Sequence, residues 1–386
     1  MNKSSCHLCS GVLFESPILQ LNGMPRAAQY YPRKNEFSTD TGIELIIYQC
    51  SGCGLVQHNL QPVDYFREVI TAATLSGKSR ASRLEQMSSF VSRFNLKGKK
   101  VLEVGSARGE MLDVLQEVGL KPVGIETSKN SVAIGRAAQR TMVQAYIGEV
   151  EHVEGAPFDS FISLNFLEHL PKPGDIIRTI YAQTTSDAVG YVTVPNLDYL
   201  LRTKCLYEFV ADHVSYFSKK TLARAFEING FDVLDCYTIN NENDIVAIVK
   251  KRPSLEIDDH YQDVESLIYK LRQIVDRYSA QNKKIAVWGA GHRTLALLAL
   301  AKLHEISCII DSAPFKQGKY TPILHKEIVS PDTIKERHID LVMIMVPGLY
   351  PSEVLNTLDN MKLDVDIAIL RDNKVEFLAQ KMKEMV

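Results

Sequence analysis

Residues 101–112 read VLEVGSARGEML, which combines an apolar strand, a glycine turn and the start of a helix. Glycine tolerates a positive φ and lets a ligand approach the backbone closely, as a nucleotide-binding turn requires. The next apolar run ends in Glu126, 21 residues after Gly105. A carboxylate there can accept hydrogen bonds from both hydroxyls of a ribose. The stretch therefore predicts a nucleotide-binding βαβ unit, for a dinucleotide or for another nucleoside, unless Glu126 is only a surface carboxylate.

Apolar strands alternate with helical patterns from residue 99 to about residue 251, which is typical of a doubly wound α/β sheet. A second alternation begins at residues 283–291, KKIAVWGAG, after an amphipathic helical stripe over residues 256–280. The pattern predicts three units. These are a small β module over residues 1–63, a central α/β domain over residues 64–252, and a linker helix with a Rossmann-like domain over residues 253–386.

Charge and hydropathy argue against a nucleic-acid-binding, secreted or membrane protein. The net charge of the 386 residues is −2, so no global basic field attracts nucleic acid or a membrane surface. The N-terminus lacks the apolar core of a secretion signal, and no run reaches the ~18 apolar residues of a spanning helix. We expect a cytoplasmic protein that binds neither nucleic acid nor membranes. The sequence indicates no oligomeric state.

Four of the seven cysteines form two CxxC pairs, Cys6 with Cys9 and Cys50 with Cys53. Two CxxC turns can supply four thiolates at ~2.3 Å from one Zn²⁺. A redox CxxC motif usually accompanies a βαβ pattern, which residues 1–63 lack. We therefore predict a structural zinc site without an open coordination position. The alternative is four cysteines that are merely buried.

A third element distinguishes between the two kinds of nucleotide site. Glu103 precedes the first glycine, and the strand that starts at residue 158 ends at Asn165 and runs into Leu-Glu-His. This combination resembles the class I S-adenosylmethionine (SAM) dependent methyltransferases. The resemblance implies that Glu103 and Gly105 lie by the methionine part of SAM, Glu126 by the ribose and Glu149 by the adenine. The other cofactor-binding residues that it implies are Ala107 (in place of the usual central glycine), Gly109, Thr127 and Asn165.

The order of the three units resembles the sugar C-methyltransferases of deoxysugar biosynthesis, over essentially the whole chain. Residues 54–57 (GLVQ), 212–218 (DHVSYFS) and 316–320 (KQGKY) support this resemblance. It implies a nucleotide-activated keto-sugar that loses a proton beside its keto group and is methylated on the resulting enolate carbon. His169 and His213 match the catalytic histidines of the family, and Asp212 stands where the family has Glu. A histidine can take the proton while a carboxylate holds its tautomer. Alternatively, both histidines are buried structural residues.

The tyrosines of the family are only partly present. One falls on Val210, and another falls in residues 69–73, VITAA, which contain no tyrosine. Tyr65 and Tyr207 could replace them from shifted positions, and Tyr216 is expected near the substrate. The usual Gly-rich stretch is replaced by residues 240–244, NNEND. Such an enzyme could use a different base, accept a different sugar, or methylate oxygen.

The glycine turn at residues 288–294, WGAGHRT, follows a strand and opens a helix, and Asp311 ends the next strand. This arrangement could bind a phosphate at a helix N-terminus or a nicotinamide cofactor. In the family context we expect it to bind the diphosphate of a nucleotide-sugar. The candidate ligands are His292, Arg293, Lys316 and Lys319. The alternative is a domain used only for packing.

Three functions are therefore to be compared. The first is a SAM-dependent C-methyltransferase for a nucleotide-activated keto-sugar, with a histidine base. The second is a SAM-dependent sugar O-methyltransferase, which needs a base but no enolate. The third is a zinc-containing scaffold protein with a vestigial SAM site, against which the intact Gly105, Gly109 and Glu126 count.

Overall fold

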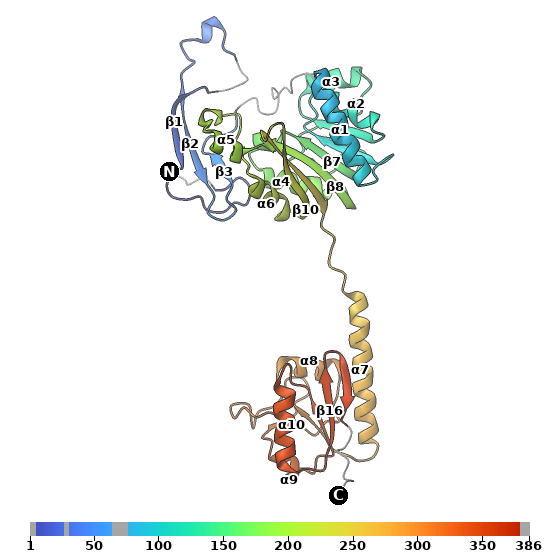
Figure 1. Cartoon of the computed structure of the whole chain (residues 1–386). Coiled ribbons are helices and arrows are strands. Elements are labelled where there is room, and N and C mark those ends of the chain that lie inside the picture. Colours follow the sequence, from blue (N-terminus) through green and yellow to red (C-terminus); the bar gives the residue numbers. More distant parts are fainter. Residues whose placement is uncertain (1–4, 27–30, 64–75, 379–386) are drawn as a thin grey trace. The chain divides into compact units, whose positions relative to one another are not determined.

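A computed structural model describes residues 5–26, 31–63 and 76–378, and it divides the chain into two compact units, Met1–Ser254 and Leu255–Val386 (Figure 1). The first unit contains both the cysteine pairs and the glycine turn of residues 101–112. The division drawn from the sequence after residue 63 therefore lies inside one compact unit, and it stays a prediction.

The core of the first unit is a seven-stranded sheet in the order β10-β11-β8-β7-β4-β5-β6. Six strands are parallel, and β11 is antiparallel to both of its neighbours. Ranked along the chain, the order from β6 to β10 is 3-2-1-4-5-7-6, which confirms the predicted doubly wound fold of a class I methyltransferase. The strands are β4 (Lys100–Val104), β5 (Lys121–Glu126), β6 (Met142–Gln144), β7 (Phe158–Leu164), β8 (Thr184–Pro195), β10 (Phe231–Ile239) and β11 (Asp244–Lys251).

Helices cover both faces of this sheet, as a mostly parallel sheet requires. On one face Phe158 and Phe161 of β7 pack with α4 (Pro173–Ala182) and α6 (Lys219–Glu227). On the other face Ile162 belongs to a cluster with α1 (Gly77–Arg93), α2 (Glu110–Glu117) and α3 (Lys129–Ala137). Because β4 is parallel to both β5 and β7, the carboxyl ends of these strands meet at one edge of the sheet, where their loops can bind a ligand.

Local sequence explains where the flanking helices begin. Helix α1 starts after Ser76, whose side chain accepts a hydrogen bond from the backbone of Ser79. Helix α6 starts with a capping box between Ser218 and Thr221. Serine and threonine at these positions satisfy backbone N–H groups that have no partner within the helix.

A smaller four-stranded sheet, in the order β1-β2-β3-β9, joins the N-terminal segment to the loop that carries His213. Its strands are β1 (Leu19–Met24), β2 (Ile43–Gln49), β3 (Val56–His58) and β9 (Ser215–Tyr216). Val56 pairs with Tyr216 and Gln57 with Ser215. Two short helices, α5 (Leu197–Thr203) and η3 (Leu206–Glu208), precede β9, and η1 (Lys34–Glu36) precedes β2. The cysteine-containing module is thus built into the wall of the central domain.

The second unit is a six-stranded sheet in the order β14-β13-β12-β15-β16-β17, in which only β17 is antiparallel to its neighbour. This order confirms the predicted Rossmann-like fold. The strands are β12 (Ile285–Trp288), β13 (Cys308–Ile310), β14 (Ile328–Val329), β15 (Leu341–Ile344), β16 (Asp366–Arg371) and β17 (Lys374–Phe377). The helices are α7 (Asp258–Ser279), α8 (His292–Ala301), α9 (Thr333–Glu336) and α10 (Tyr350–Met361). Leu271 and Val275 of α7, from the predicted helical stripe, pack into the core of this unit.

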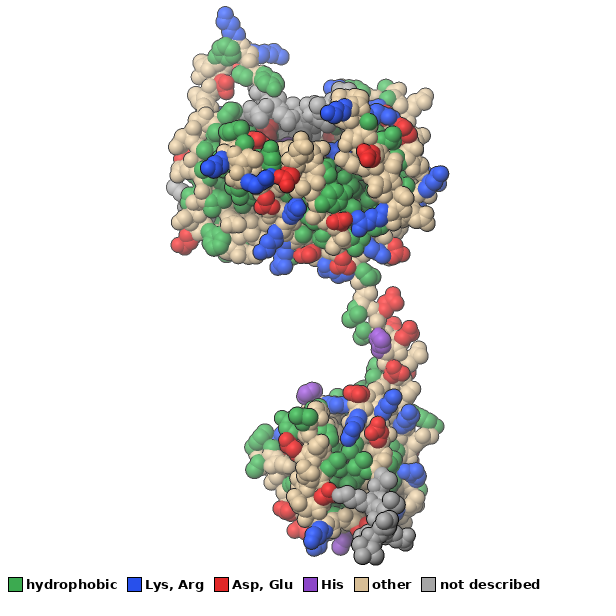
Figure 2. Space-filling view, in the orientation of Figure 1, with side chains coloured by type: hydrophobic (Ala, Val, Ile, Leu, Met, Phe, Trp, Pro, Cys, Tyr) green, Lys and Arg blue, Asp and Glu red, His purple; other side chains and the backbone are tan. Residues whose placement is uncertain are grey.

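Surface charge is mixed. Acidic and basic side chains are interspersed on the face of each unit shown in Figure 2, over the residues that are coloured there. Among the described residues, no helix is both long enough and apolar enough to cross a membrane.

Candidate active site

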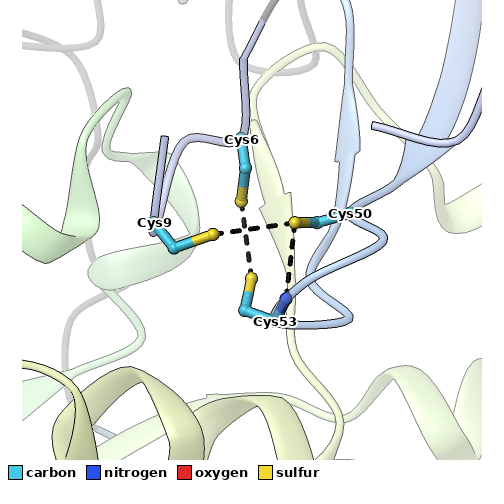
Figure 3. Close-up of side chains that lie close together, drawn as sticks. All are labelled: Cys6, Cys9, Cys50 and Cys53. Carbon is cyan, nitrogen blue, oxygen red and sulfur yellow. Dashed lines mark hydrogen bonds between the residues drawn. The ribbon is translucent and has the colours of Figure 1, made fainter. Parts of the chain in front are cut away.

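The four cysteines of the two CxxC pairs lie together (Figure 3). The Sγ atoms of Cys6 and Cys53 are 3.5 Å apart, and those of Cys9 and Cys50 are 3.6 Å apart. A tetrahedral ion with metal–sulfur bonds of ~2.3 Å needs sulfur–sulfur edges of about 3.8 Å. The backbone N–H groups of Gly52 and Cys53 point at the Cys50 sulfur from 3.4 Å. The cluster can therefore hold a metal ion, and its sulfur donors suit Zn²⁺.

A cavity of about 320 Å³ lies at the carboxyl edge of the large sheet. Four of the predicted cofactor-binding residues line it: Glu103, Gly105, Ala107 and Asn165. Gly109, Glu126, Thr127 and Glu149 are not among its lining residues. The sequence did not identify the α1 side of this cavity, which is formed by Ser79, Ser82, Arg83 and Gln86. Their spacing could have indicated them as site residues, because it places four polar side chains on one face of a helix.

Glu126 holds the glycine loop in place. Its Oε2 accepts a hydrogen bond from the backbone N–H of Ala107 at 2.9 Å, and its Oε1 accepts one from Ser128 at 2.8 Å. Each carboxylate oxygen has a second lone pair, so the group can still accept from a ribose hydroxyl. Burial raises the pKa of Glu126, while these backbone N–H groups act against that rise. Glu126 therefore shapes the loop as well as the expected ribose site.

The glycine loop uses left-handed backbone at three positions. Gly105 has φ +74°, and a Cβ on it would lie 2.4 Å from the ring of Phe166. Gly109 has φ +82° and begins α2. Ala107 has φ +48°, a conformation that costs an alanine roughly 1–2 kcal/mol. The alanine that replaces the usual glycine is thus accommodated with backbone strain.

Glu103 brings a buried carboxyl to the cavity. The residue is 5% exposed, and its Oε2 has no hydrogen-bond partner among the described residues. Burial raises its pKa well above the usual range, with smaller contributions from Glu110 and Glu126. A donor on a ligand in this cavity would complete its hydrogen bonding.

A second cavity of about 210 Å³ contains the histidine side of the site. Its lining residues include His213, Glu168, Tyr216 and Asp244, and also Asn165, which lines the first cavity as well. Asn165 is fixed by two side-chain hydrogen bonds: its Oδ1 accepts from Thr193 at 2.8 Å and its Nδ2 donates to Asp244 at 3.0 Å. The two cavities therefore meet at one immobilised amide.

His213 lines the second cavity, whereas His169 lies beside it and is 4% exposed. The ring centroids are 4.8 Å apart. Burial lowers the pKa of His213 to about 3, with further contributions from His169 and His58, so the ring is neutral near pH 7. Burial also lowers the pKa of His169.

Asp212 contacts His169 through its backbone. Its carbonyl oxygen accepts a hydrogen bond from Nδ1 of His169 at 2.8 Å. This contact places the proton of neutral His169 on Nδ1 and leaves Nε2 as the acceptor. The Asp212 carbonyl, which bonds to the His169 ring, belongs to the peptide that leads into His213.

The predicted substrate tyrosines have unequal positions. The hydroxyl of Tyr216 donates to the carbonyl of Val210 at 2.9 Å and accepts from its N–H at 2.8 Å. The hydroxyl proton is therefore not available to donate to a substrate. Tyr207 is 70% exposed, donates to Cys205 and does not line the cavity. Tyr65 and residues 69–73 lie outside the described residues.

Three acids line the second cavity, Glu168, Asp244 and Glu208, and none was predicted as a site residue. Glu168 belongs to the 3-10 helix η2 (Leu167–His169), which directly follows Asn165 and Phe166. Asp244 begins β11 and ends the NNEND stretch, in which Asn240 lines the first cavity. The unusual run of polar residues was the available signal for Asp244. The Glu-His pair after the strand was the signal for Glu168.

The second unit forms a compact loop around Asp311. Its carboxylate accepts from the backbone N–H groups of Ala290 (2.8 Å) and Ala313 (2.9 Å) and pairs with Lys316 at 2.8 Å. Burial alone would raise the pKa of Asp311, but these donors lower it, the Lys316 hydrogen bond most of all. Arg293 donates to the carbonyl of Asp372, while His292 and Lys319 are exposed. Two of the four predicted diphosphate ligands are thus already engaged within the unit.

Two family models match separate parts of the chain. Residues 79–235 match a family described as a methyltransferase domain, and residues 254–363 match one described as a C-methyltransferase C-terminal domain. The C-methyltransferase NovU of Streptomyces niveus is 23% identical over 374 residues, which are 88% of each chain. A ubiquinone biosynthesis O-methyltransferase of Acinetobacter baumannii (strain ACICU) is 30% identical over 104 residues. Those residues are 25% of this chain and only 43% of that relative.

Solved methyltransferase structures are similar to part of the chain. A SAM-dependent methyltransferase from Clostridium acetobutylicum ATCC 824 has a TM-score of 0.37 and 8% identity, covering 44% of this chain and 92% of its own. The magnesium protoporphyrin IX methyltransferase of Synechocystis PCC 6803, with bound SAH, has a TM-score of 0.38 and 13% identity. That match covers 49% of this chain and 97% of the other.

Proposed function

The chain belongs to the SAM-dependent C-methyltransferases, and on this premise we propose that it methylates a carbon beside the keto group of a nucleotide-activated sugar, with His213 as the base. The observation that carries the proposal is the position of Asn165, which lines both cavities. One cavity contains the glycine loop and the other contains His213. A methyl donor in the first and an acceptor in the second would meet at this side chain.

The residues of the first cavity suit the cofactor. When bound, SAM supplies an electrophilic methyl group on a sulfonium centre. The buried Oε2 of Glu103 has no hydrogen-bond donor among the described residues, and the cationic amino group of SAM could supply one. The missing side chain of Gly105 keeps the turn open beside Phe166, and Glu126 would accept from the ribose. Glu149 and Thr127 are proposed to lie by the adenosine.

The residues of the second cavity suit proton abstraction from a carbon acid. The pKa of His213 is lowered to about 3 by burial, so the ring is neutral near pH 7 and one of its nitrogens can accept a proton. His169 packs edge-on against this ring at 4.8 Å, with its own tautomer fixed by Asp212. We propose that His169 and Asp212 position His213, while the ring of Tyr216 contacts the substrate.

Zinc is proposed as a structural ion. The sulfur–sulfur distances of 3.5 and 3.6 Å and the four thiol donors support it. The sheet that carries the cysteine module also contains β9, only two residues after His213. We propose that the ion fixes this sheet and, through it, the histidine loop.

The second unit is proposed to bind the diphosphate of the nucleotide-sugar. Its Gly289–Gly291 turn precedes α8, whose first N–H groups can bind a phosphate. Lys319 and His292 are exposed and available, whereas Lys316 would have to leave Asp311, and Arg293 would have to leave Asp372.

The proposal is tested with a panel of nucleoside-diphosphate keto-sugars and SAM, by mass spectrometry of the sugar. We expect methylation of at least one member. The His213→Ala variant should lose turnover by far more than it loses SAM affinity in calorimetry. The reason is that His213 lies in the second cavity, which is proposed to hold the acceptor and is called the acceptor cavity below. Equal losses of turnover and SAM affinity would contradict the role of His213 as a base.

A further inference from the structure

Glu168 places a carboxyl group in the wall of the acceptor cavity. The residue is 2% exposed, and its Oε2 has no hydrogen-bond partner among the described residues. Its Oε1 is 3.9 Å from Nε2 of His169, too far for a hydrogen bond. One ligand atom each of Glu168, His169 and His213 lie within 4.8 Å of one another. The buried Oε2 has no partner among the described residues, and a group in the cavity could supply one.

We propose that Glu168 takes part in the reaction as a neutral carboxylic acid, donating a hydrogen bond to the acceptor's carbonyl oxygen as that oxygen becomes an enolate. This inference rests on the proposed function, because it assumes a keto acceptor and His213 as the base. It adds a catalytic residue that the sequence did not single out.

The weakness of the base creates the need for such a donor. A histidine whose pKa is lowered to about 3 holds an abstracted proton poorly. It can take a proton from carbon only if the charge that develops on the carbonyl oxygen is stabilised in the same step. A preorganised donor in a water-poor site supplies that stabilisation, and removing one typically costs ~10²–10³ in kcat.

Other side chains with donors also line the cavity wall. The Tyr216 proton goes to Val210, and one of the two Nδ2 protons of Asn165 goes to Asp244. Asn243 and Glu208 are exposed. The hydroxyl of Ser215 is buried and without a partner among the described residues, so Ser215 is the competing candidate. Glu168 is favoured because a carboxylic acid is the stronger hydrogen-bond donor and has no other described acceptor.

The surroundings of Glu168 keep it protonated. Burial raises its pKa to about 8, and the negative charge of Asp244 on β11 adds to this rise. The other titratable groups nearby are His169 and His213, whose pKa values burial lowers, and the exposed Glu208 at the cavity wall. No described cation pairs with Glu168 to favour its ionised form.

The step balances in atoms and charge. The C–H bond beside the carbonyl breaks, its proton goes to His213, and its electron pair moves toward the oxygen hydrogen-bonded by Glu168. The enolate carbon then forms a bond to the methyl group, as the S–CH₃ bond of SAM breaks with its pair left on sulfur. The carbonyl re-forms, Glu168 keeps its proton, and His213 releases one proton to solvent.

A first experiment needs no substrate. The protonated-carboxyl C=O band is measured by difference infrared spectroscopy between the wild-type chain and Glu168→Gln, from about pH 6 to about pH 10. The difference isolates Glu168 because Glu103 is present in both proteins. We expect the band near pH 7 and its loss with a midpoint near 8. Its absence at pH 7 would overturn the proposal even if no sugar is ever methylated.

A second experiment measures turnover with whichever keto-sugar is methylated, and SAM affinity serves as the control for folding. Glu168→Ala should lose at least ~100-fold in kcat. Glu168→Gln, which keeps a neutral donor, should retain activity within about 10-fold. The wild-type kcat should decline above about pH 8, whereas that of Glu168→Gln should not. Ser215→Ala tests the competing donor and should lose less kcat than Glu168→Ala.

Three results would overturn the role of Glu168. The first is Glu168→Gln being as inactive as Glu168→Ala. The second is a larger loss in Ser215→Ala than in Glu168→Ala. The third is turnover that requires added Mg²⁺ or Mn²⁺, because a metal held by Glu168, His169 and His213 would need the ionised carboxylate. Failure of the methylation assay itself would count against the proposed function and leave the infrared result to decide on Glu168.

Discussion

Asn165 donates a hydrogen bond from Nδ2 to Oδ1 of Asp244 at 3.0 Å, and this pair lies where the two cavities of the catalytic unit meet. Asn165 comes from the end of β7 and has φ +47°, while Asp244 begins β11, so the bond joins strands separated in the sheet by β8. Asp244 also accepts from Asn240. This network fixes the place at which donor and acceptor are proposed to meet.

Asn165→Ala should uncouple the two cavities. We expect kcat to fall by roughly 10- to 100-fold with a smaller change in SAM affinity, because the alanine loses orientation of both partners. Ser82→Ala is the matched control, since Ser82 lines the first cavity but not the second and should affect SAM binding more than kcat. Steady-state kinetics with calorimetry separates the two variants. Identical profiles for both would argue against a special position of Asn165.

Gly105→Ala should damage SAM binding through a clash as well as through backbone strain. A Cβ at Gly105 would lie 2.4 Å from the Phe166 ring, whereas a Cβ at Gly98, with a similar φ of +79°, meets nothing within 4 Å. Gly98→Ala should therefore cost only the left-handed strain, roughly 1–2 kcal/mol of unfolding free energy. We expect Gly105→Ala to cost more and to weaken SAM binding at least ~10-fold. Urea unfolding and calorimetry on both variants check this.

Metal analysis should find one zinc ion per chain. Cys50→Ser should lose the ion, because it removes one of four converging thiols, and should lower Tm by at least ~5 °C. The matched control is Cys205→Ser, which lies outside the cluster and should keep zinc and Tm. We also expect Cys50→Ser to reduce turnover through the β3–β9 pairing near His213. A zinc-free wild-type chain with normal Tm and turnover would rule out the structural ion.

The pH dependence of stability should carry the signature of Glu168. In the unfolded chain a glutamate has a pKa of about 4.3, whereas the folded value is raised to about 8. Between these values the folded state binds more protons, so stability falls as pH rises through this window. Relative to Glu168→Gln, the unfolding free energy of the wild type should decline from about pH 4.3 to about pH 8 and then level off. Unfolding free energies are measured by urea unfolding at each pH. If those of the two proteins changed in parallel with pH, the pKa of Glu168 would be the same in the folded and unfolded chain.

The local signals in the sequence sufficed for the parts of the site that lie close together along the chain. The glycine turn at Gly105, the acid Glu126 one strand later and the two CxxC pairs are set by short-range spacing. The carboxyl ends of parallel strands meet at one edge, so Asn165 also follows from the strand pattern.

The remaining parts of the site depend on long-range packing, which a single sequence does not specify. Residue 216 pairs with residue 56 across the small sheet, and Asp244 reaches Asn165 from a different strand. The hydroxyl of Tyr216 bonds to the backbone of Val210, and the carbonyl of Asp212 bonds to His169, 43 residues earlier in the chain.

The central claim is methyl transfer to carbon through an enolate, and its most direct test is NMR of the product formed in D₂O with SAM carrying a ¹³C-methyl group. We expect the labelled methyl to be bonded to a ring carbon next to the keto group. We also expect wild-type enzyme, but not His213→Ala, to exchange the proton on the same carbon of the unmethylated substrate for deuterium. A labelled methyl on oxygen, formed without any such exchange, would contradict the account.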